Sequence, residues 1–470
     1  MLLRDSVIVG LVITGLAFAN PVLAQLTRSE DESGGDTPSR SKQLVIPDSI
    51  GRVPANNDYD DPASDYSFAR MVEGPNVAIF WHREYGDVPM QNPDSARTFN
   101  PYRMLEETER YYRYYVDELQ YVREGQSVTD HNKLLVFVFG GEGGTAFGGG
   151  VDDIGVFWTP AVRVHREPYG VIAHELAHSF QYMSRIDSGA GARGGIGEMA
   201  AQYFLWQVLP GWQEFENYHL EDFMGKTHYA FLHGTNIYHS PYVIEYWSNK
   251  HGLTFWGELN RNTLPDEDVV ATYKRLQGLS QAEFNDEMFD AARRFITWDL
   301  PRLQEISRPY RNQHQSELIR DEDGWYRIAP SRAPQNYGYN GIELVVPAGG
   351  TTVGLRFRGM PGAEGYGRKN VELAGWRYGF VAYQADGTRV YSEVWSDSSG
   401  DVSFTVPGDT EHLWLVVMGA PEEHFPVAGR RRGALASEAP AEEAWPYAVR
   451  LTHTSIDEDF IGDDGEPTGS

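Results

Sequence analysis

The sequence predicts an α+β protein, in which a mixed region of strands and helices at residues 44–310 precedes an all-β sandwich or jelly roll at residues 320–455. In the first region, short apolar runs of strand length alternate with amphipathic segments of helical period. In the second, the helical period disappears, and Pro, Gly and Asp turn signals separate short apolar runs. Residues 308–323 are polar and have no sustained apolar period, so we place the domain boundary there.

Two runs in the first region are typical of buried strands, residues 77–81 and 134–139, because they are apolar, β-branched and aromatic. Residues 101–122 have no internal proline or glycine and repeat apolar side chains near a 3.6-residue period, which predicts an amphipathic helix packed on a sheet. Further helices are expected at residues 168–183, 198–208, 243–250, 266–276 and 281–298.

The second region has strand-like runs at residues 341–346, 352–357, 378–384, 402–406 and 413–418. Several short strands at this spacing predict a sandwich or jelly roll. Aromatic side chains in this region could stack on sugar rings, but residues that alternate along strands lie more often in a core. They include Trp325, Tyr337, Tyr339, Trp376, Tyr383 and Trp395.

The two ends of the chain have their own signatures. Residues 1–24 read as a secretory signal peptide, with Arg4, an apolar run of about 12 residues and small residues before a cleavage site near Ala24–Gln25. The run is shorter than the ~20 residues of a membrane helix, so we expect no membrane anchor after cleavage and a secreted or periplasmic bacterial protein. Residues 25–43 are expected to be a flexible leader, and residues 456–470 a disordered acidic tail.

Composition excludes several functions. The 40 Lys and Arg against 67 Asp and Glu give a net charge of −27, so nucleic acid is not expected as a partner. The 12 Trp, 27 Tyr and 22 Phe are too many for a disordered protein. The absence of cysteine excludes disulfides, thiolate metal sites and cysteine nucleophiles.

One motif carries the chemistry: residues 169–181 read YGVIAHELAHSFQ. His174 and His178 are four apart, so on a helix both imidazoles face one metal ion, and Glu175 lies beside them as a general base. A catalytic zinc site commonly has a third protein ligand on another element. Glu198 is the candidate, because it follows a glycine-rich connection and opens an apolar helix. A Glu in a first helical turn can also serve only the helix dipole.

This segment, residues 134–208, resembles the gluzincin branch of the zincin metallopeptidases, which carry HExxH on one helix and a glutamate ligand on the next. The resemblance implies a zincin-like catalytic domain at residues 44–310 and one zinc ion per chain bound by His174, His178 and Glu198. Glu175 would be general base and then proton donor. With Phe80-Trp81, HELAHSFQ, residues 292–299 and residues 413–421, the chain also resembles a family of secreted bacterial proteins of unassigned function.

Further site residues follow from this comparison. Many gluzincins have an aspartate four residues after the glutamate ligand that orients a ligand histidine, and this chain has Gln202 there. Gln181 is a second candidate for that task, although on the outer face of the helix it would be ordinary surface. The strand before the active-site helix is the substrate-pairing edge in zincins, which indicates Gly155, Val156, Phe157 and Trp158. Tyr238 and His239, in the loop before Pro241, are candidates for stabilising the oxyanion, although each could be purely structural.

The function predicted from these residues is a secreted zinc peptidase that cleaves a protein, peptide or glycoprotein substrate with a zinc-activated water and Glu175 as the base. The alternative is a secreted protein- or glycan-binding protein on a zincin frame with an idle or structural metal site. Gln202 and the aromatic β region favour that alternative, and the intact His174, Glu175 and His178 oppose it.

Overall fold

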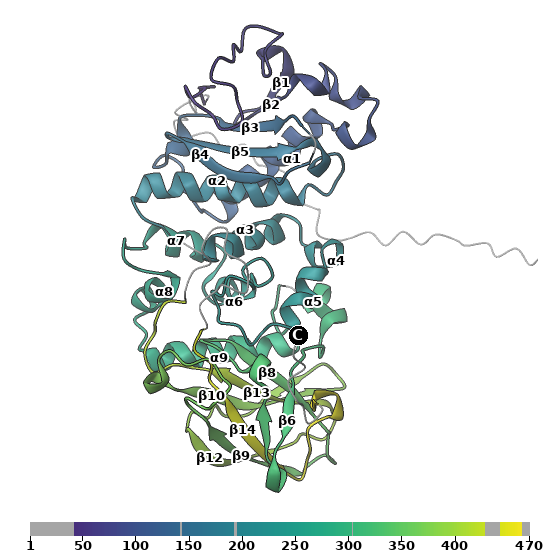
Figure 1. Cartoon of the computed structure of the whole chain (residues 1–470), viewed down its shortest axis with the longest axis vertical. Helices are drawn as coiled ribbons and strands as arrows, with labels where there is room; N and C mark the ends of the chain where they lie inside the picture. The colour runs from purple at the N-terminus through teal and green to yellow at the C-terminus, as the bar shows by residue number, and fades with distance from the viewer. Residues whose placement is uncertain (1–41, 142, 192–194, 303, 428–441, 463–470) are drawn as a thin grey trace, which may run out of the picture. The chain divides into compact units, whose positions relative to one another are not determined.

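The computed structural model describes residues 42–141, 143–191, 195–302, 304–427 and 442–462. The predicted signal peptide and nearly all of the predicted leader lie outside these residues. The chain from Lys42 onward is one compact unit, and it combines helices with three sheets (Figure 1), so the predicted α+β class is confirmed. In the part that the structure describes, no helix is both long and apolar enough to span a bilayer.

The first sheet has five strands in the order β1-β2-β3-β5-β4. The middle strands β2, β3 and β5 are parallel, and β1 and β4 pair antiparallel at the two edges. Every residue of β2, β3 and β5 is buried, which explains their unbroken apolar runs. The bounds are β1 (Met71–Glu73), β2 (Val77–Trp81), β3 (Leu134–Phe139), β4 (Phe147–Val151) and β5 (Ile154–Pro160).

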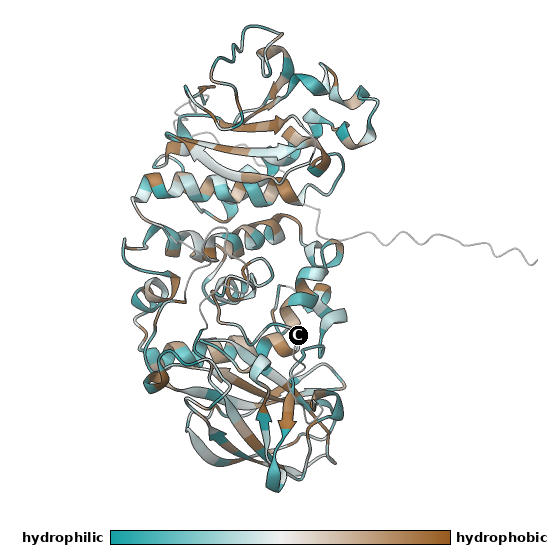
Figure 2. Ribbon diagram, in the orientation of Figure 1, coloured by the Kyte–Doolittle hydropathy of each residue, from teal (hydrophilic) through white to brown (hydrophobic). Residues whose placement is uncertain are grey.

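Each face of this sheet has its own cover. Helices α1 (Pro101–Arg113) and α2 (Gly170–Ser188) pack on one face, with Met104, Ile172 and Phe180 in the main core. The segment before β1 covers the other face, where Ile50 and Tyr66 join a second apolar cluster. Helix α1 begins at Pro101, as the sequence predicted for residues 101–122, but after Arg113 it changes into a π-helical turn, Tyr114–Glu118. Figure 2 shows the apolar strands and the mixed polar and apolar character of α2.

A helical layer follows α2. Its longest members, α3 (Gly195–Val208), α6 (Tyr242–His251) and α9 (Gln281–Ile296), contact one another in sequence. Helix α9 begins with a capping box between Ser280 and Glu283. Besides α1, the predicted helices correspond to α2, α3, α6, α8 and α9. The four remaining helices are short and were not expected. They are α4 (Trp212–Phe215), α5 (Tyr218–Met224), α7 (Phe255–Arg261) and α10 (Gln304–Ser307), and α8 is Val269–Gln277.

Two antiparallel sheets complete the chain, in the orders β11-β10-β13-β8 and β12-β9-β14-β7-β6. They pack face to face through aromatic pairs: the rings of Phe357 and Tyr378 stack at 4.1 Å, and those of Phe380 and Phe404 at 5.5 Å. Helix α9 contacts β10 and β13. The strands are β6 (Leu318–Arg320), β7 (Tyr326–Ile328), β8 (Tyr339–Leu344), β9 (Thr352–Gly359), β10 (Trp376–Gln384), β11 (Arg389–Tyr391), β12 (Ser399–Thr405), β13 (Thr410–Gly419) and β14 (Tyr447–Thr452).

The chain remains packed beyond β14, into the predicted acidic tail. Ile456 is 2% exposed and bridges Leu344, and Ile461 bridges Leu318. The prediction that the chain is disordered from residue 456 onward is therefore corrected. Apolar side chains at 456, 460 and 461 pack the chain against the β sheets up to residue 462. Residues 463–470 lie outside the described part of the chain.

Candidate metal centre

Helices α2 and α3 bring three donor atoms together. His174 and His178 lie one turn apart on α2, and Glu198 comes from the first turn of α3. The two Nε2 atoms are 3.1 Å apart, and Oε2 of Glu198 is 3.3 Å from His174 Nε2 and 3.1 Å from His178 Nε2. The structure thus assembles the three side chains that the sequence indicated as ligands.

The spacing of these donors fits zinc. Tetrahedral zinc with bonds of 2.0–2.2 Å holds its ligand atoms about 3.3–3.6 Å from one another. The three separations are 3.1–3.3 Å, so the atoms lie close to one face of such a tetrahedron. Two imidazoles and one carboxylate also form a donor set that zinc takes in catalytic sites, with a fourth position left over.

Gln181 orients one of the two rings. Its amide nitrogen donates to the carbonyl of Gly197 at 2.8 Å, which turns the amide oxygen toward His178 Nδ1 at 3.1 Å. Nδ1 of His178 therefore carries the hydrogen, and the lone pair on Nε2 faces the other two donors. Gln181 therefore lies beside His178, one of the two candidate histidine ligands.

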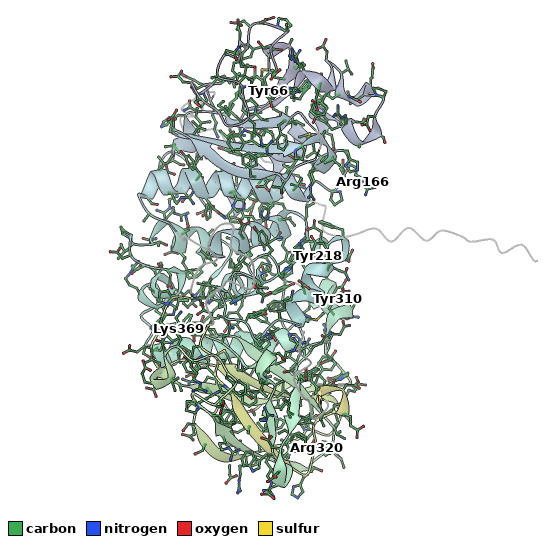
Figure 3. The ribbon with its side chains drawn as sticks, viewed as in Figure 1. Tyr66, Arg166, Tyr218, Tyr310, Arg320 and Lys369 are labelled. Carbon is green, nitrogen blue, oxygen red and sulfur yellow. The ribbon has the colours of Figure 1, made fainter. Side chains whose placement is uncertain are left out.

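Gln202 has a different partner from the one expected. It is 4% exposed, and its amide nitrogen lies 3.4 Å from Nε2 of His219, a residue of α5 (Tyr218–Met224). The expectation that Gln202 orients a ligand histidine is thus corrected: its amide nitrogen pairs with His219, and not with His174 or His178. Figure 3 marks Tyr218, whose ring lies 4.1 Å from that of His219.

The pKa values of the two carboxyl groups in this cluster, Glu175 and Glu198, are shifted in opposite directions. Burial raises the pKa of Glu175, which is 7% exposed and accepts a backbone hydrogen bond from Gly148. Burial also opposes the charge on Glu198, but hydrogen bonds with His174 and His178 outweigh it and hold the pKa of Glu198 well below its usual value. Glu198 is therefore ionised, whereas burial disfavours the charged form of Glu175.

The substrate-strand prediction needs correction. Gly155, Val156, Phe157 and Trp158 lie in β5, which is hydrogen-bonded to β3 on one side and β4 on the other. An interior strand has no main-chain groups left for a substrate, so the edge next to α2 is β4. A Cβ on Gly148 would overlap the carbonyl oxygen of Glu175 and lie 2.7 Å from Cβ of His178, so glycine is what lets β4 approach the motif helix.

The structure separates the two predicted oxyanion residues. The Tyr238 ring stacks beside that of His174, with centroids 6.3 Å apart and planes 23° apart, and Tyr238 is 38% exposed. His239 instead pairs with two residues of α5: its Nδ1 lies 2.7 Å from Nδ1 of His219, and its Nε2 lies 3.3 Å from a carboxylate oxygen of Asp222. Tyr238 is therefore the one that lies beside a candidate ligand.

His219 and Asp222 are the residues of this neighbourhood that the sequence did not reveal. Burial and the neighbouring His239 and His174 lower the pKa of His219 to about 4, so it is neutral at physiological pH. Both residues lie on α5, a helix of only seven residues, and their partners are 17 to 20 residues away along the chain. The only sequence signal for this pair was that His219 is a histidine, but its spacing to His174 and His178 follows no ligand pattern.

Tyr238 lies in the loop between α5 and α6, residues 225–241, and hydrogen bonds join this loop to the β region at residues 320–455. The main-chain NH of Tyr339 donates to the carbonyl of Thr227 at 2.8 Å, and the Thr227 hydroxyl donates to the carbonyl of Tyr339 at 2.8 Å. Gln335 accepts from the NH of Ala230 at 3.0 Å and donates its own NH to the carbonyl of His228 at 2.8 Å. Residues 335–339 thus fix the start of the loop.

Fold and site define an α+β protein in which the half-buried His174, His178 and Glu198 and the buried Glu175 form one cluster beside the edge strand β4. The family model described as "Family of unknown function (DUF6055)" matches residues 36–458, and the chain belongs to this family. No curated protein matches it. Among solved structures it is similar to the M60 catalytic domain with the CBM51-1 and CBM51-2 domains from Clostridium perfringens ZmpB, at 10% identity over 84% of this chain, with a TM-score of 0.27. The chain spans 60% of that structure's length, and a TM-score this low does not define a shared fold.

Proposed function

We propose that this protein is a zinc-dependent peptidase of the gluzincin type. The observation that carries the proposal is the convergence of His174 Nε2, His178 Nε2 and Glu198 Oε2 within a few ångströms, with Glu175 on the same helix. A purely structural zinc site would need the ligands but not a buried carboxylate of raised pKa beside them.

Each residue of the centre has a role in this proposal. His174, His178 and Glu198 would hold one zinc ion, which when bound supplies Lewis acidity and lowers the pKa of water. Glu175 accepts a proton from the attacking water and returns it to the leaving nitrogen, a task that suits a carboxylate whose pKa burial has raised. Gln181 keeps His178 in the tautomer that offers Nε2 to the metal.

The substrate is a protein or peptide in extended form, glycoproteins included. Strand β4 lies at the sheet edge and contacts α2, so a peptide that pairs with it runs past the motif helix. Tyr238, stacked beside His174, is the donor that we assign to the oxyanion of the reaction.

The β region supports the site in this account. Residues 335–339 hold the loop that carries Tyr238, and we propose residues 44–310 as the catalytic region and residues 320–455 as its accessory region. Tyr337, Tyr339 and Trp376 are at most 6% exposed, so these three aromatic rings pack in the core and do not favour glycan binding. We further propose that the protein is exported after cleavage near Ala24.

A substrate screen with a matched variant tests the proposal. The purified protein and Glu175→Gln are incubated with a denatured protein, a glycoprotein and a polysaccharide, and products are identified by mass spectrometry. Cleavage of peptide bonds is expected, with a loss of at least about 10²-fold in the variant because its amide cannot act as a base. Full activity of Glu175→Gln with the metal bound would refute the mechanism.

A further inference from the structure

The edge strand β4 contains three successive glycines, and two of them have a clear packing reason. A Cβ on Gly148 would overlap the Glu175 carbonyl oxygen, and one on Gly150 would overlap the Tyr182 ring. These two glycines therefore let β4 lie against α2. A Cβ on Gly149 would meet no described atom within 4 Å, and its φ is outside the left-handed region, so neither space nor backbone conformation requires glycine there.

Gly149 lies on the other face of the strand. Successive residues alternate, so it shares a face with Phe147 and Val151, two residues away on either side. The Phe147 ring stacks on Trp158 at 4.7 Å, and the Arg52 guanidinium lies 5.4 Å from it. Phe147 and Val151 are both half-buried and pack on the second apolar cluster. Gly149 is thus a bare position between two apolar side chains.

A peptide paired with β4 would place one of its side chains at this bare position. Directly opposed residues of neighbouring strands point to the same face, with Cβ atoms about 4.5–5.5 Å apart. The peptide residue opposite Gly149 therefore points to the face of Phe147 and Val151, where no Cβ of β4 stands in its way. Its neighbours along the peptide point to the α2 face, where the candidate ligands lie.

We propose that Gly149 is a specificity-determining residue, which leaves room for a bulky apolar side chain on the substrate residue that pairs with it. The inference rests on the proposed peptidase function and names the substrate that the site accepts: an extended peptide with a large apolar residue at one fixed subsite. Phe147 and Val151 supply its apolar contacts, and the missing side chain at Gly149 supplies the space.

The test compares cleavage of a peptide library by the wild-type protein, Gly149→Val and Gly149→Ala. The ratio of kcat/KM for a large apolar residue over alanine at the selected subsite is expected to fall at least about tenfold in Gly149→Val, the scale set by a few methyl or methylene groups in a pocket. Gly149→Ala adds one methyl group into open space, and an intermediate fall is expected.

Gly408→Val is the matched control, because a Cβ there also meets no described atom within 4 Å and Gly408 lies in the turn between β12 and β13. It is expected to keep the wild-type ratio. Thermal melting and zinc content establish that each variant is folded and loaded; if Gly149→Val does not fold, Gly149→Ala carries the comparison.

Three results overturn the inference. The first is a wild-type protein that shows no preference for a large apolar residue. The second is a kcat/KM ratio that stays unchanged in folded Gly149→Val and Gly149→Ala. Both leave the peptidase proposal standing, because the wild type still cleaves peptides. No cleavage by zinc-loaded wild-type protein overturns the proposed function and the inference with it.

Discussion

The Nδ1 atoms of His219 and His239 lie 2.7 Å apart, so one ring donates its hydrogen to the other. Asp222 decides the direction: its carboxylate is 3.3 Å from Nε2 of His239 and requires a hydrogen on that nitrogen. Burial lowers the pKa of both histidines, which favours the neutral rings. His219 therefore donates to His239, and His239 donates to Asp222, which leaves His239 without a ring NH for a substrate.

This arrangement predicts unequal effects of two neighbouring substitutions. Tyr238→Phe should lower kcat/KM by about 10²–10³-fold, the cost of losing one oxyanion donor. His239→Asn should lower it much less, because both ring nitrogens of His239 already have partners, His219 and Asp222. Steady-state kinetics on zinc-loaded proteins measures both, and a larger loss for His239→Asn would reverse the assignment.

Gln181 should control metal affinity. Gln181→Leu removes the acceptor of His178 Nδ1, and the loss of such a partner typically weakens metal binding by 10–100-fold. Gln202→Leu is the matched control, because the recorded partner of Gln202 is His219 and not a ligand. Competition with a chromophoric chelator measures both affinities; equal values for the two variants would contradict the assignment.

Gln335 should affect catalysis from the β region. Gln335→Ala leaves the NH of Ala230 without its acceptor, which should cost about 1 kcal/mol of unfolding free energy and loosen the loop before Tyr238. We expect a lower kcat with unchanged zinc content. A variant with normal kcat would show that the loop needs no support from Gln335.

His314 should make the fold sensitive to acid. It is 2% exposed, its Nε2 lies 2.8 Å from the Tyr339 hydroxyl, and burial lowers its pKa to about 3. An unfolded histidine titrates near 6.5, so the unfolded chain binds the extra proton first as pH falls. The neutral ring therefore contributes stability above pH 6.5 that is lost, by about 1.4 kcal/mol per pH unit, between about pH 6.5 and 3.

The comparison is urea unfolding of wild-type protein and His314→Asn at several pH values, with chelator present so that zinc release does not contribute. The variant should lose stability less steeply on acidification, by about one proton. Parallel curves for the two proteins would show that His314 does not titrate on unfolding.

The sequence predicted the parts of this site that depend on spacing within one helix. His174, His178 and Gln181 fall on one face of α2 because three- and four-residue steps share a face. Glu198 followed from the next helix. The partner of Gln202 could not be predicted, because His219 reaches it from α5 through tertiary packing.

The order of the strands in the first sheet could not be predicted from the sequence either. Both β4 and β5 precede α2, and the more apolar β5 had the stronger strand signal, but it lies between β3 and β4. The glycines of β4 carry little β propensity, and contacts with α2 explain only Gly148 and Gly150. Likewise, the tail after residue 455 has an acidic composition, yet Ile456 and Ile461 pair with the sheets.

Metal content tests the central claim most directly. Zinc per chain is measured on the purified protein after zinc is supplied and excess removed, beside His178→Ala and His314→Asn. About one zinc per chain in the wild type and in His314→Asn, with loss in His178→Ala, is the predicted result. No zinc in the wild type, or equal zinc in His178→Ala, would contradict a metal centre at His174, His178 and Glu198.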